Sequence, residues 1–397
     1  MKLFIISLLF GYIGLVGAQS NNTEYDQAYF DITIDAAKEG YPPAQLRLGL
    51  MYLRGEGVPK NNDEAVKWIQ KAAAQDDIEA QATLALIAGV SDDSRMDTAV
   101  QLKIGLMYLD GEIVPKNGDE AVKWVRKAAK KGDAVAQYNL GVIYRDGLGV
   151  TKDYDLAIGW FEKAAARGNL ESQFYLASYY VEGDGVSKNY AKAAKWYRMA
   201  AVQGLENAQF RLGYLYMVGG NGLQRNYNEA ARWFRKSAEQ GYTKAQFVLG
   251  TMYDSGRGMP QSHAKAVKWY RMAAEKDYPE AQYNLGWMYF AGEGVPKSSD
   301  EAAKWYRKAA MKGFPRAQFN LGVMIFEGEG VPKDSVLGYA WMSLAASAGD
   351  EKTTAYLSIA KAKMTREDIE AAQLLVASGS LVDLSSKKAK NSSKKTE

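Results

Sequence analysis

The chain has 397 residues, no cysteine and a single histidine, which excludes a disulfide framework, thiolate metal sites, a cysteine nucleophile and a multi-histidine metal cluster. Its formal charge is +4, and the five lysines and one glutamate between Ser386 and Glu397 carry a charge of the same size. The rest of the chain is therefore close to neutral and lacks the basic footprint that nucleic-acid binding requires.

Residues 1–18 have the pattern of a signal peptide. Lys2 precedes an apolar run from Leu3 to Val16, and the small residues Gly17 and Ala18 follow. The alternative is a membrane anchor, but a span needs about 20 apolar residues and this run is shorter. We expect export to the periplasm or secretion, and we expect residues 19–43 to hold a lead-in helix.

Tryptophans reveal an internal repeat over residues 44–352. Eight of the nine are separated by 56, 36, 36, 37, 36, 36 and 36 residues, and a fixed period in the mid-thirties indicates a helical solenoid. There are eight full units, and a truncated ninth unit falls near 80–99. The full units begin near Ala44, Val100, Ala136, Ser172, Ala208, Ala245, Ala281 and Ala317.

Each unit reads as a helix, a tight loop and a second helix. In the unit from Ala281, apolar residues recur at helical spacing in both segments, and loop glycines with Pro296 end the first helix. A capping box is expected to start the second helix at Ser298 with Glu301, and likewise at Asn61 with Glu64 and at Asn117 with Glu120.

Glycine occupies the middle of seven first helices, and alanine takes that place once, at Ala177. Such a glycine costs roughly 1 kcal/mol relative to alanine, so we expect it to allow close contact between the two helices of a unit, facing alanine pairs such as Ala309 and Ala310. The tryptophan of the second helix is expected to fill the seam between units. The glycines are Gly49, Gly105, Gly141, Gly213, Gly250, Gly286 and Gly322.

The string A-Q-x-x-L-G-x-M-Y-x-x-G-x-G-V-P, followed by E-A-x-K-W-Y-R-K-A-A-x-x-G, resembles the Sel-one-like repeat (SLR) family, a branch of the tetratricopeptide-like superhelices. The resemblance covers roughly residues 28–360 and implies an all-α, right-handed superhelical solenoid. It also implies a scaffold that binds proteins and performs no catalysis.

The truncated unit and the C-terminus depart from this pattern. Ala80–Gly89 supplies a first helix, but no tryptophan helix follows before Met96, so we expect a kink or a looser joint between about 90 and 98. Residues 353–380 are predicted to form capping helices, since solenoid ends need a cover. Residues 381–397 are predicted to be a disordered basic tail, the one segment expected to touch a membrane.

Several patterns that suggest chemistry have simpler structural explanations. The recurring G-x-G pairs lie between helices and lack the wider phosphate-loop fingerprint. Glu56, Glu293 and Glu329 are separated by whole repeats, so no paired carboxylates are expected. His263, in the first turn of a helix, is expected to be exposed. We therefore predict no catalytic residue, no cofactor and no metal.

The resemblance places the partner on the first helices, at positions three before, one after and four after the mid-helix glycine. These positions hold Leu46, Leu50 and Leu102 near the N-terminus. Large exposed aromatic residues are typical anchors, although the first position of each set has an alternative role in packing against the next unit. The predicted partner-binding residues are Tyr283, Trp287, Phe290, Phe319, Phe326, Phe210, Tyr214, Met217, Tyr138 and Arg145.

The sequence favours an exported, monomeric scaffold for a protein or peptide ligand, with roles in envelope assembly, signalling or host interaction implied by the resemblance. Two alternatives stay open. Cysteine-rich relatives are described as binding or hydrolysing β-lactams, but this chain has no cysteine. The other alternative is a peptidoglycan- or lipid-binding envelope protein.

Overall fold

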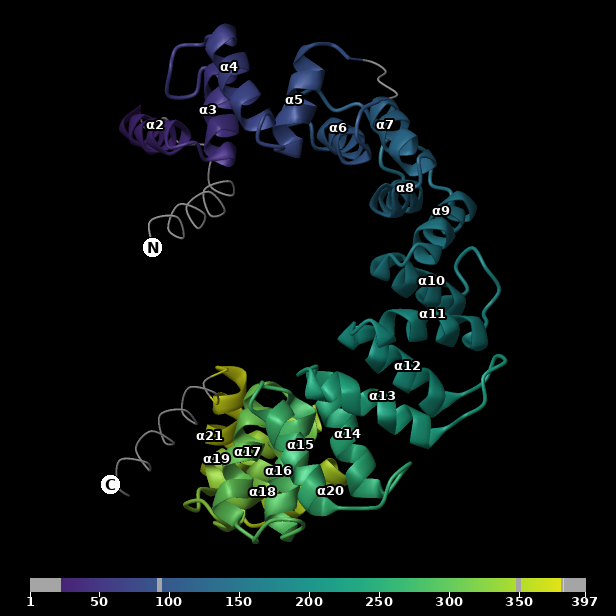
Figure 1. Ribbon diagram of the computed structural model, residues 1–397. Coiled ribbons are helices and arrows are strands. Elements are labelled where there is room, and N and C mark those ends of the chain that lie inside the picture. The colour runs from purple at the N-terminus through teal and green to yellow at the C-terminus, as the bar shows by residue number, and fades with distance from the viewer. Residues whose placement is uncertain (1–22, 91–94, 348–350, 380, 382–397) are drawn as a thin grey trace. The chain divides into compact units, whose positions relative to one another are not determined.

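The computed structural model describes residues 23–90, 95–347, 351–379 and 381. The predicted signal peptide and the basic tail beyond Leu381 lie outside them. Within the described residues there are 20 α-helices and no strand, only a single isolated bridge between Gly220 and Leu223 (Figure 1). The prediction of an all-α fold is confirmed.

Sixteen of the helices form eight antiparallel pairs that repeat about every 36 residues. The first helices of the pairs are α3 (Pro42–Arg54), α6 (Thr98–Asp110), α8 (Ala134–Asp146), α10 (Leu170–Glu182), α12 (Glu206–Val218), α14 (Thr243–Ser255), α16 (Pro279–Ala291) and α18 (Pro315–Glu327). The second helices are α4 (Asn62–Ala73), α7 (Gly118–Lys130), α9 (Tyr154–Ala166), α11 (Tyr190–Val202), α13 (Tyr227–Glu239), α15 (His263–Ala274), α17 (Ser299–Met311) and α19 (Ser335–Ala346).

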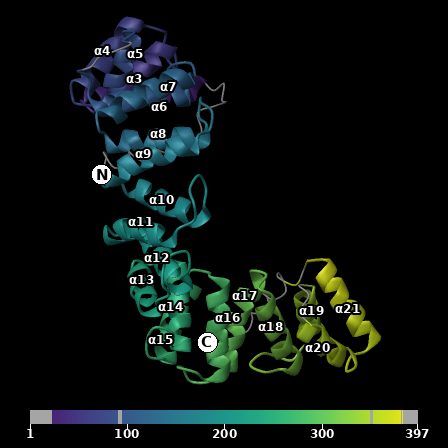
Figure 2. The same ribbon diagram turned by 90° about the vertical axis from the view of Figure 1, so that its right-hand side faces the viewer.

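Four helices lie outside the pairs: α2 (Thr23–Lys38), α5 (Ile78–Ile87), α20 (Glu351–Lys361) and α21 (Arg366–Ala377). α2 packs on α3, and both α20 and α21 pack on α19. The chain divides into two compact units, residues 1–173 and 174–397. In the second unit, α16 to α19 follow one another in chain order (Figure 2).

The mid-helix glycines bring the two helices of a pair into close contact, as predicted. A Cβ atom added at Gly286 would lie 2.8 Å from Cδ1 of Tyr306, and one added at Gly250 would lie 2.7 Å from Cδ1 of Tyr270. The glycine therefore faces the residue directly after the repeat tryptophan. The prediction that it faces the alanine pair of Ala309 and Ala310 is wrong. Hydrogen in place of a methyl group leaves room for that large side chain.

The repeat tryptophans differ in burial, which corrects the prediction that all of them fill the seam. Trp124 and Trp341 are 1% and 0% exposed, whereas Trp160 and Trp305 are half-buried. Lysines three residues further on lie over several of these rings; the Nζ of Lys163 is 4.0 Å from the centroid of Trp160. The residue after each tryptophan is the one that is always buried: Ile69, Val125, Phe161, Tyr197, Phe234, Tyr270, Tyr306 and Met342.

A buried glutamine at the start of seven of the eight first helices has a role that the sequence analysis missed. Its Nε2 donates to a carbonyl eight residues earlier, at the C-terminal end of the preceding helix, as Gln282 does to Ala274 over 3.0 Å. Such end carbonyls have no partner within their own helix. The same contact joins Gln45 to Ala37, Gln137 to Ala129, Gln173 to Ala165, Gln209 to Ala201, Gln246 to Ala238 and Gln318 to Ala310.

Replacing Gln282 by alanine is expected to lower the free energy of unfolding by about 1 kcal/mol, the net value of one hydrogen bond, because the Ala274 carbonyl loses the Gln282 amide and keeps the backbone N–H of Asp277 as its donor. Gln203, which is exposed and donates to the carbonyl of Met199, provides the control, and Gln203→Ala should change stability by no more than about 0.5 kcal/mol. Urea denaturation followed by circular dichroism measures both, and equal effects would contradict this role.

The predicted caps of the second helices are present in part. The Ser298 hydroxyl accepts a hydrogen bond from the backbone N–H of Glu301 over 3.2 Å, and Asn61 and Asn117 cap their helices in the same way. The reciprocal half of the capping box is replaced by an ion pair, since the Glu301 carboxylate lies 2.7 Å from the Nζ of Lys304.

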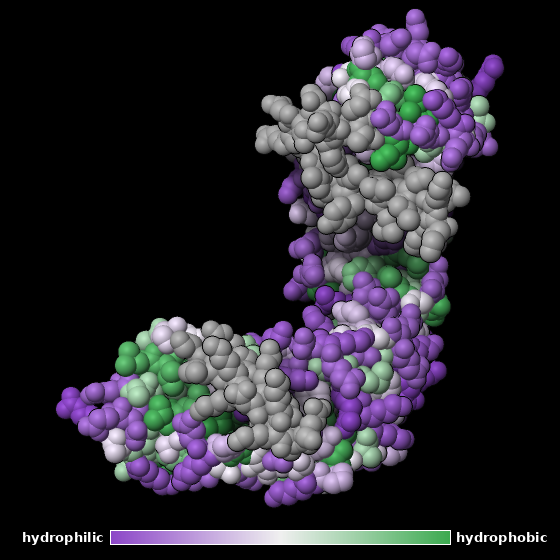
Figure 3. All heavy atoms as spheres, turned by 90° about the vertical axis from the view of Figure 1, so that its left-hand side faces the viewer, coloured by the Kyte–Doolittle hydropathy of each residue, from purple (hydrophilic) through white to green (hydrophobic). Residues whose placement is uncertain are grey.

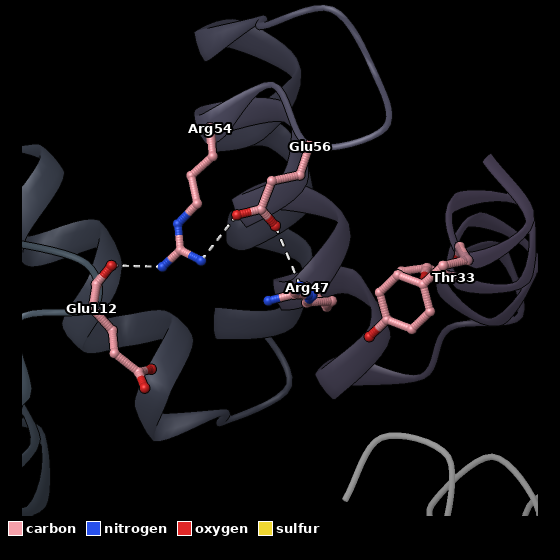
Figure 4. Close-up of polar contacts among 6 residues, drawn as sticks. Thr33, Arg47, Arg54, Glu56 and Glu112 are labelled. Carbon is pink, nitrogen blue, oxygen red and sulfur yellow. Dashed lines mark hydrogen bonds and ion pairs between the residues drawn. The ribbon is translucent and has the colours of Figure 1, made fainter. Parts of the chain in front are cut away.

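Among the described residues, the truncated unit has the single helix α5, which packs on both α4 and α6. Residues 91–94, within the stretch where a kink was predicted, lie outside the described residues. The flanking repeats are nevertheless linked through their loops. Arg54 Nη2 donates to the carbonyl of Glu112 over 2.6 Å, and its Nη1 lies 3.3 Å from Oε1 of Glu56, which also pairs with Arg47 (Figure 4). The repeats on either side of α5 are therefore in direct polar contact, and the prediction of a looser joint did not include this contact.

Candidate functional site

The aromatic side chains of α16 make the most exposed part of the predicted partner-binding face. Leu285 and Met288 turn into the core, and Trp287 is left outside with 46% of its surface exposed. Its indole lies over the side chain of Phe290, with ring centroids 6.0 Å apart. Phe290 is half-buried, and the Nζ of Lys297 lies 5.8 Å from its centroid. The sequence analysis placed Trp287 and Phe290 together, and the structure does as well.

The aromatic residues at the first position of each set pack along the stack. The Tyr283 ring lies 5.7 Å from Tyr306 of the same pair and 5.3 Å from Phe314 at the start of the next. Phe210 makes the corresponding contacts with Phe234 and Tyr242, at 5.5 and 5.1 Å. These rings join neighbouring repeats, as the packing alternative describes.

Two further first-position rings also pack against aromatic neighbours, Tyr138 within its own pair and Phe319 against the helix that follows the last pair. Tyr138 lies 5.9 Å from Phe161, and Phe319 meets Tyr356 of α20 edge-on at 5.6 Å. All four first-position side chains are half-buried, so they offer a partner only their outer edges.

Phe326 is buried, with 4% of its surface exposed, so the prediction that it lies on an exposed binding face is wrong. Gly338 of α19 replaces the alanine found at that place in other second helices, and a Cβ there would lie 2.6 Å from the backbone nitrogen of Phe326. The close approach of α19 covers the ring. Leu46, Leu50 and Leu102, at the first or second position of the two N-terminal sets, are also buried.

The remaining predicted residues lie on other first helices. Tyr214 of α12 is 48% exposed, whereas Met217 is half-buried and packs against the cluster around Phe234. Arg145 donates two hydrogen bonds to its neighbour Asp146, at 2.7 and 2.6 Å, which holds the pKa of that carboxyl below its usual value.

Figure 3 shows hydrophobic patches separated by hydrophilic side chains on the face it presents.

Between the exposed aromatic residues of α12 and α16, the helix α14 contributes polar groups. The Tyr270 hydroxyl donates to Oγ1 of Thr251 over 3.3 Å. Burial raises the pKa of Tyr270 to about 12 and also raises that of Tyr306. Both hydroxyls are protonated at neutral pH.

A cluster with metal-ligating side chains lies at the end of this face. One ligand atom from each of Asp254, His263 and Glu293 falls within 4.8 Å of the other two. The sequence analysis compared Glu293 only with Glu56 and Glu329, which lie whole repeats away, and it missed the approach to Asp254 and His263. That approach occurs because the loop of one repeat reaches the second helix of the repeat before it. The pattern that could have revealed this is the glycine that follows Glu293, which packs against the start of α15.

No helix among the described residues has both the length and the apolar character needed to cross a bilayer. The described part of the chain also has no cysteine. The sequence predicts no catalytic group, and the partly exposed His263 is paired with Asp254, its Nδ1 lying 2.9 Å from Oδ1.

The Sel1 repeat family model matches eight segments of the chain. They are residues 42–77, 98–133, 134–169, 170–205, 207–242, 243–278, 279–314 and 315–350. Residues 78–97, which contain the lone helix α5, fall between the first two matches. No curated protein matches the chain.

Solved structures of Sel1 repeat proteins are similar to this chain. A Sel1 repeat protein from Oxalobacter formigenes is 30% identical, with a TM-score of 0.56, over 86% of this chain and 95% of that one. A protective antigen of uropathogenic Escherichia coli with an SLR fold is 32% identical, with a TM-score of 0.48, over 87% of this chain and 85% of that one. An immunity protein from Pseudomonas aeruginosa is 21% identical, with a TM-score of 0.30, over 54% of this chain and 81% of that one.

Proposed function

The chain belongs to the Sel1 repeat family, and from this premise we propose that it is an exported scaffold that binds a protein or peptide partner through the first-helix side chains around Trp287. Sel1 repeat proteins are generally protein-interaction scaffolds and are typically not enzymes. The partner, the export and the binding residues are the specific parts of the proposal.

The exposure of Trp287 is the observation that carries this proposal. Most of the apolar residues of α16 are buried or half-buried, yet nearly half of this indole faces solvent beside Phe290. An exposed tryptophan does not stabilise the repeat as the buried ones do, whereas it is a strong anchor for a partner because it buries a large apolar area at little cost in side-chain entropy. Tyr214 supplies a second exposed aromatic on α12.

Export is supported by the order of Lys2, the apolar run and the small residues at Gly17 and Ala18. The absence of cysteine from the sequence means that stability in an oxidising compartment comes from helix packing alone. An exported scaffold of this kind fits roles in envelope assembly, signalling or contact with a host.

Replacing Trp287 by alanine is expected to abolish capture of the partner and to leave the melting temperature within about 1 °C of the wild type, since an exposed side chain contributes little to stability. Capture by the immobilised protein from its own cells, quantified by mass spectrometry, identifies the proteins that wild type retains and the variant loses. Tyr154→Ala removes an aromatic residue of similar exposure, 43%, from the second helix α9 and should retain them.

Unfolding of the Trp287→Ala protein would make this residue part of the core and would remove the proposed site. Equal capture by both variants would move the binding surface elsewhere.

A further inference from the structure

Asp254, His263 and Glu293 come from three elements of two adjacent repeats. Asp254 lies in the last turn of α14, His263 is the first residue of α15, and Glu293 lies in the loop after α16. Their ligand atoms lie within 4.8 Å of one another. His263 is the only histidine of the chain.

The backbone around these three residues is held in place. The side chain of Ser262 caps α15 by accepting from the backbone N–H of Lys265, and Gln261 Nε2 donates to the carbonyl of Asp254 over 2.7 Å. A Cβ at Gly294, which has φ of +73°, would lie 2.6 Å from the carbonyl oxygen of His263. The loop that carries Glu293 therefore lies directly on the start of α15.

The negative charge of the cluster is not balanced by a lysine or arginine. The Asp254 carboxylate is paired with the His263 ring, and neither it nor the Glu293 carboxylate has a lysine or arginine ion pair among the described residues. Lys265 and Lys297, close to them in sequence, lie over the rings of Tyr253 and Phe290. Two carboxylates without a lysine or arginine partner, beside an imidazole, are a ligand set that can attract a metal cation.

The other repeats show that this combination is specific to one place. One repeat further along, Ser299 replaces the histidine, and its hydroxyl donates to Oε1 of Glu329 over 3.1 Å, so the loop glutamate again reaches the preceding second helix. Phe290 there takes the place of Asp254. Among the described residues, the group of Asp254, His263 and Glu293 is the one that brings three such ligands together.

We propose that Asp254, His263 and Glu293 bind a divalent first-row transition-metal ion of the Zn²⁺ type. One imidazole nitrogen and two carboxylate oxygens are ligands that Zn²⁺ accepts, and water completes the coordination at this partly open site. Ca²⁺ and Mg²⁺ are hard cations that take oxygen ligands, so the imidazole nitrogen favours a transition-metal ion over either of them. The ion joins the repeat 243–278 to the loop of the repeat 279–314.

Isothermal titration of the exported chain, prepared without a histidine tag, with ZnCl₂ tests the proposal. We expect one Zn²⁺ per chain, and much weaker heats with CaCl₂ or MgCl₂. His263→Gln and Glu293→Gln should each weaken Zn²⁺ binding by at least about tenfold, the lower bound for loss of even a second-shell partner. Glu329→Gln, the same substitution one repeat further on, should bind Zn²⁺ like the wild type.

The single histidine gives a second readout that does not depend on heat. One equivalent of Zn²⁺ should shift the only imidazole resonance in the proton NMR spectrum, and Glu293→Gln should reduce that shift. A resonance that does not move, or one-to-one Zn²⁺ binding that survives both His263→Gln and Glu293→Gln, would overturn the proposal. The apo variants should keep the wild-type circular dichroism spectrum, because these side chains are partly exposed.

Discussion

Replacing Trp124 by alanine is expected to lower the free energy of unfolding by about 3–5 kcal/mol, the usual cost of removing a buried tryptophan. The side chain is 1% exposed and packs in a cluster with Val100, Ile104 and Met107 of α6, together with alanines of α5. The loss would leave a cavity where the lone helix α5 meets the next pair.

Trp160 is the matched comparison, because it has the same place in the repeat but is half-buried, with Lys163 over its ring. Trp160→Ala should cost no more than about 2 kcal/mol, since only part of the indole leaves water on folding. Urea denaturation of both variants measures the difference. Equal losses would mean that the period of the tryptophans marks equivalent core positions after all.

Replacing Gly105 by alanine is expected to destabilise the protein by about 1–2 kcal/mol, although alanine is the better helix former by about 1 kcal/mol. The added Cβ would lie 2.5 Å from Cγ2 of Val125, 3.0 Å from the carbonyl oxygen of Ala121 and 3.1 Å from the backbone nitrogen of Val125. Two of these atoms are backbone, and the third belongs to a stiff β-branched side chain, so α6 and α7 must separate.

Replacing Gly159 by alanine is expected to change the free energy of unfolding in the opposite direction. Gly159 also lies within a helix, but no atom lies within 4 Å of the position of the added Cβ. Gly159→Ala should stabilise the protein by up to about 1 kcal/mol through helix propensity alone. Both substitutions fall in residues 1–173 and make the same chemical change. Stabilisation by both variants would contradict the close contact between the paired helices.

The repeat itself could be predicted from the sequence because its signals are local and recur. Tryptophan spacing located the second helices, and glycine in the middle of the first helices indicated close contact within each pair. The identity of the facing residue could not be obtained in this way. Tyr306 and Trp305 are adjacent and both aromatic, and only the rotation of α17 about its axis decides that Tyr306 faces Gly286.

Polar contacts between repeats were the part that the sequence analysis missed. The bond from Gln282 to Ala274 joins the first helix of one repeat to the second helix of the repeat before it, and a helical pattern does not show how such ends meet. Glu293 and His263 were considered separately for the same reason. Phe326 occupies a position that is half-exposed in other repeats, and it is buried because the glycine at 338 lets α19 come closer.

Site-specific photo-crosslinking tests the proposed function most directly. A photoreactive phenylalanine analogue at position 287, and the same analogue at position 154 on a second helix of similar exposure, are placed in the protein expressed in its own cells. We expect a defined protein crosslinked from position 287 and not from position 154, and lost when Phe290→Ala is added. Crosslinks from position 154 alone, or the same products from both positions, would contradict binding through the first helices.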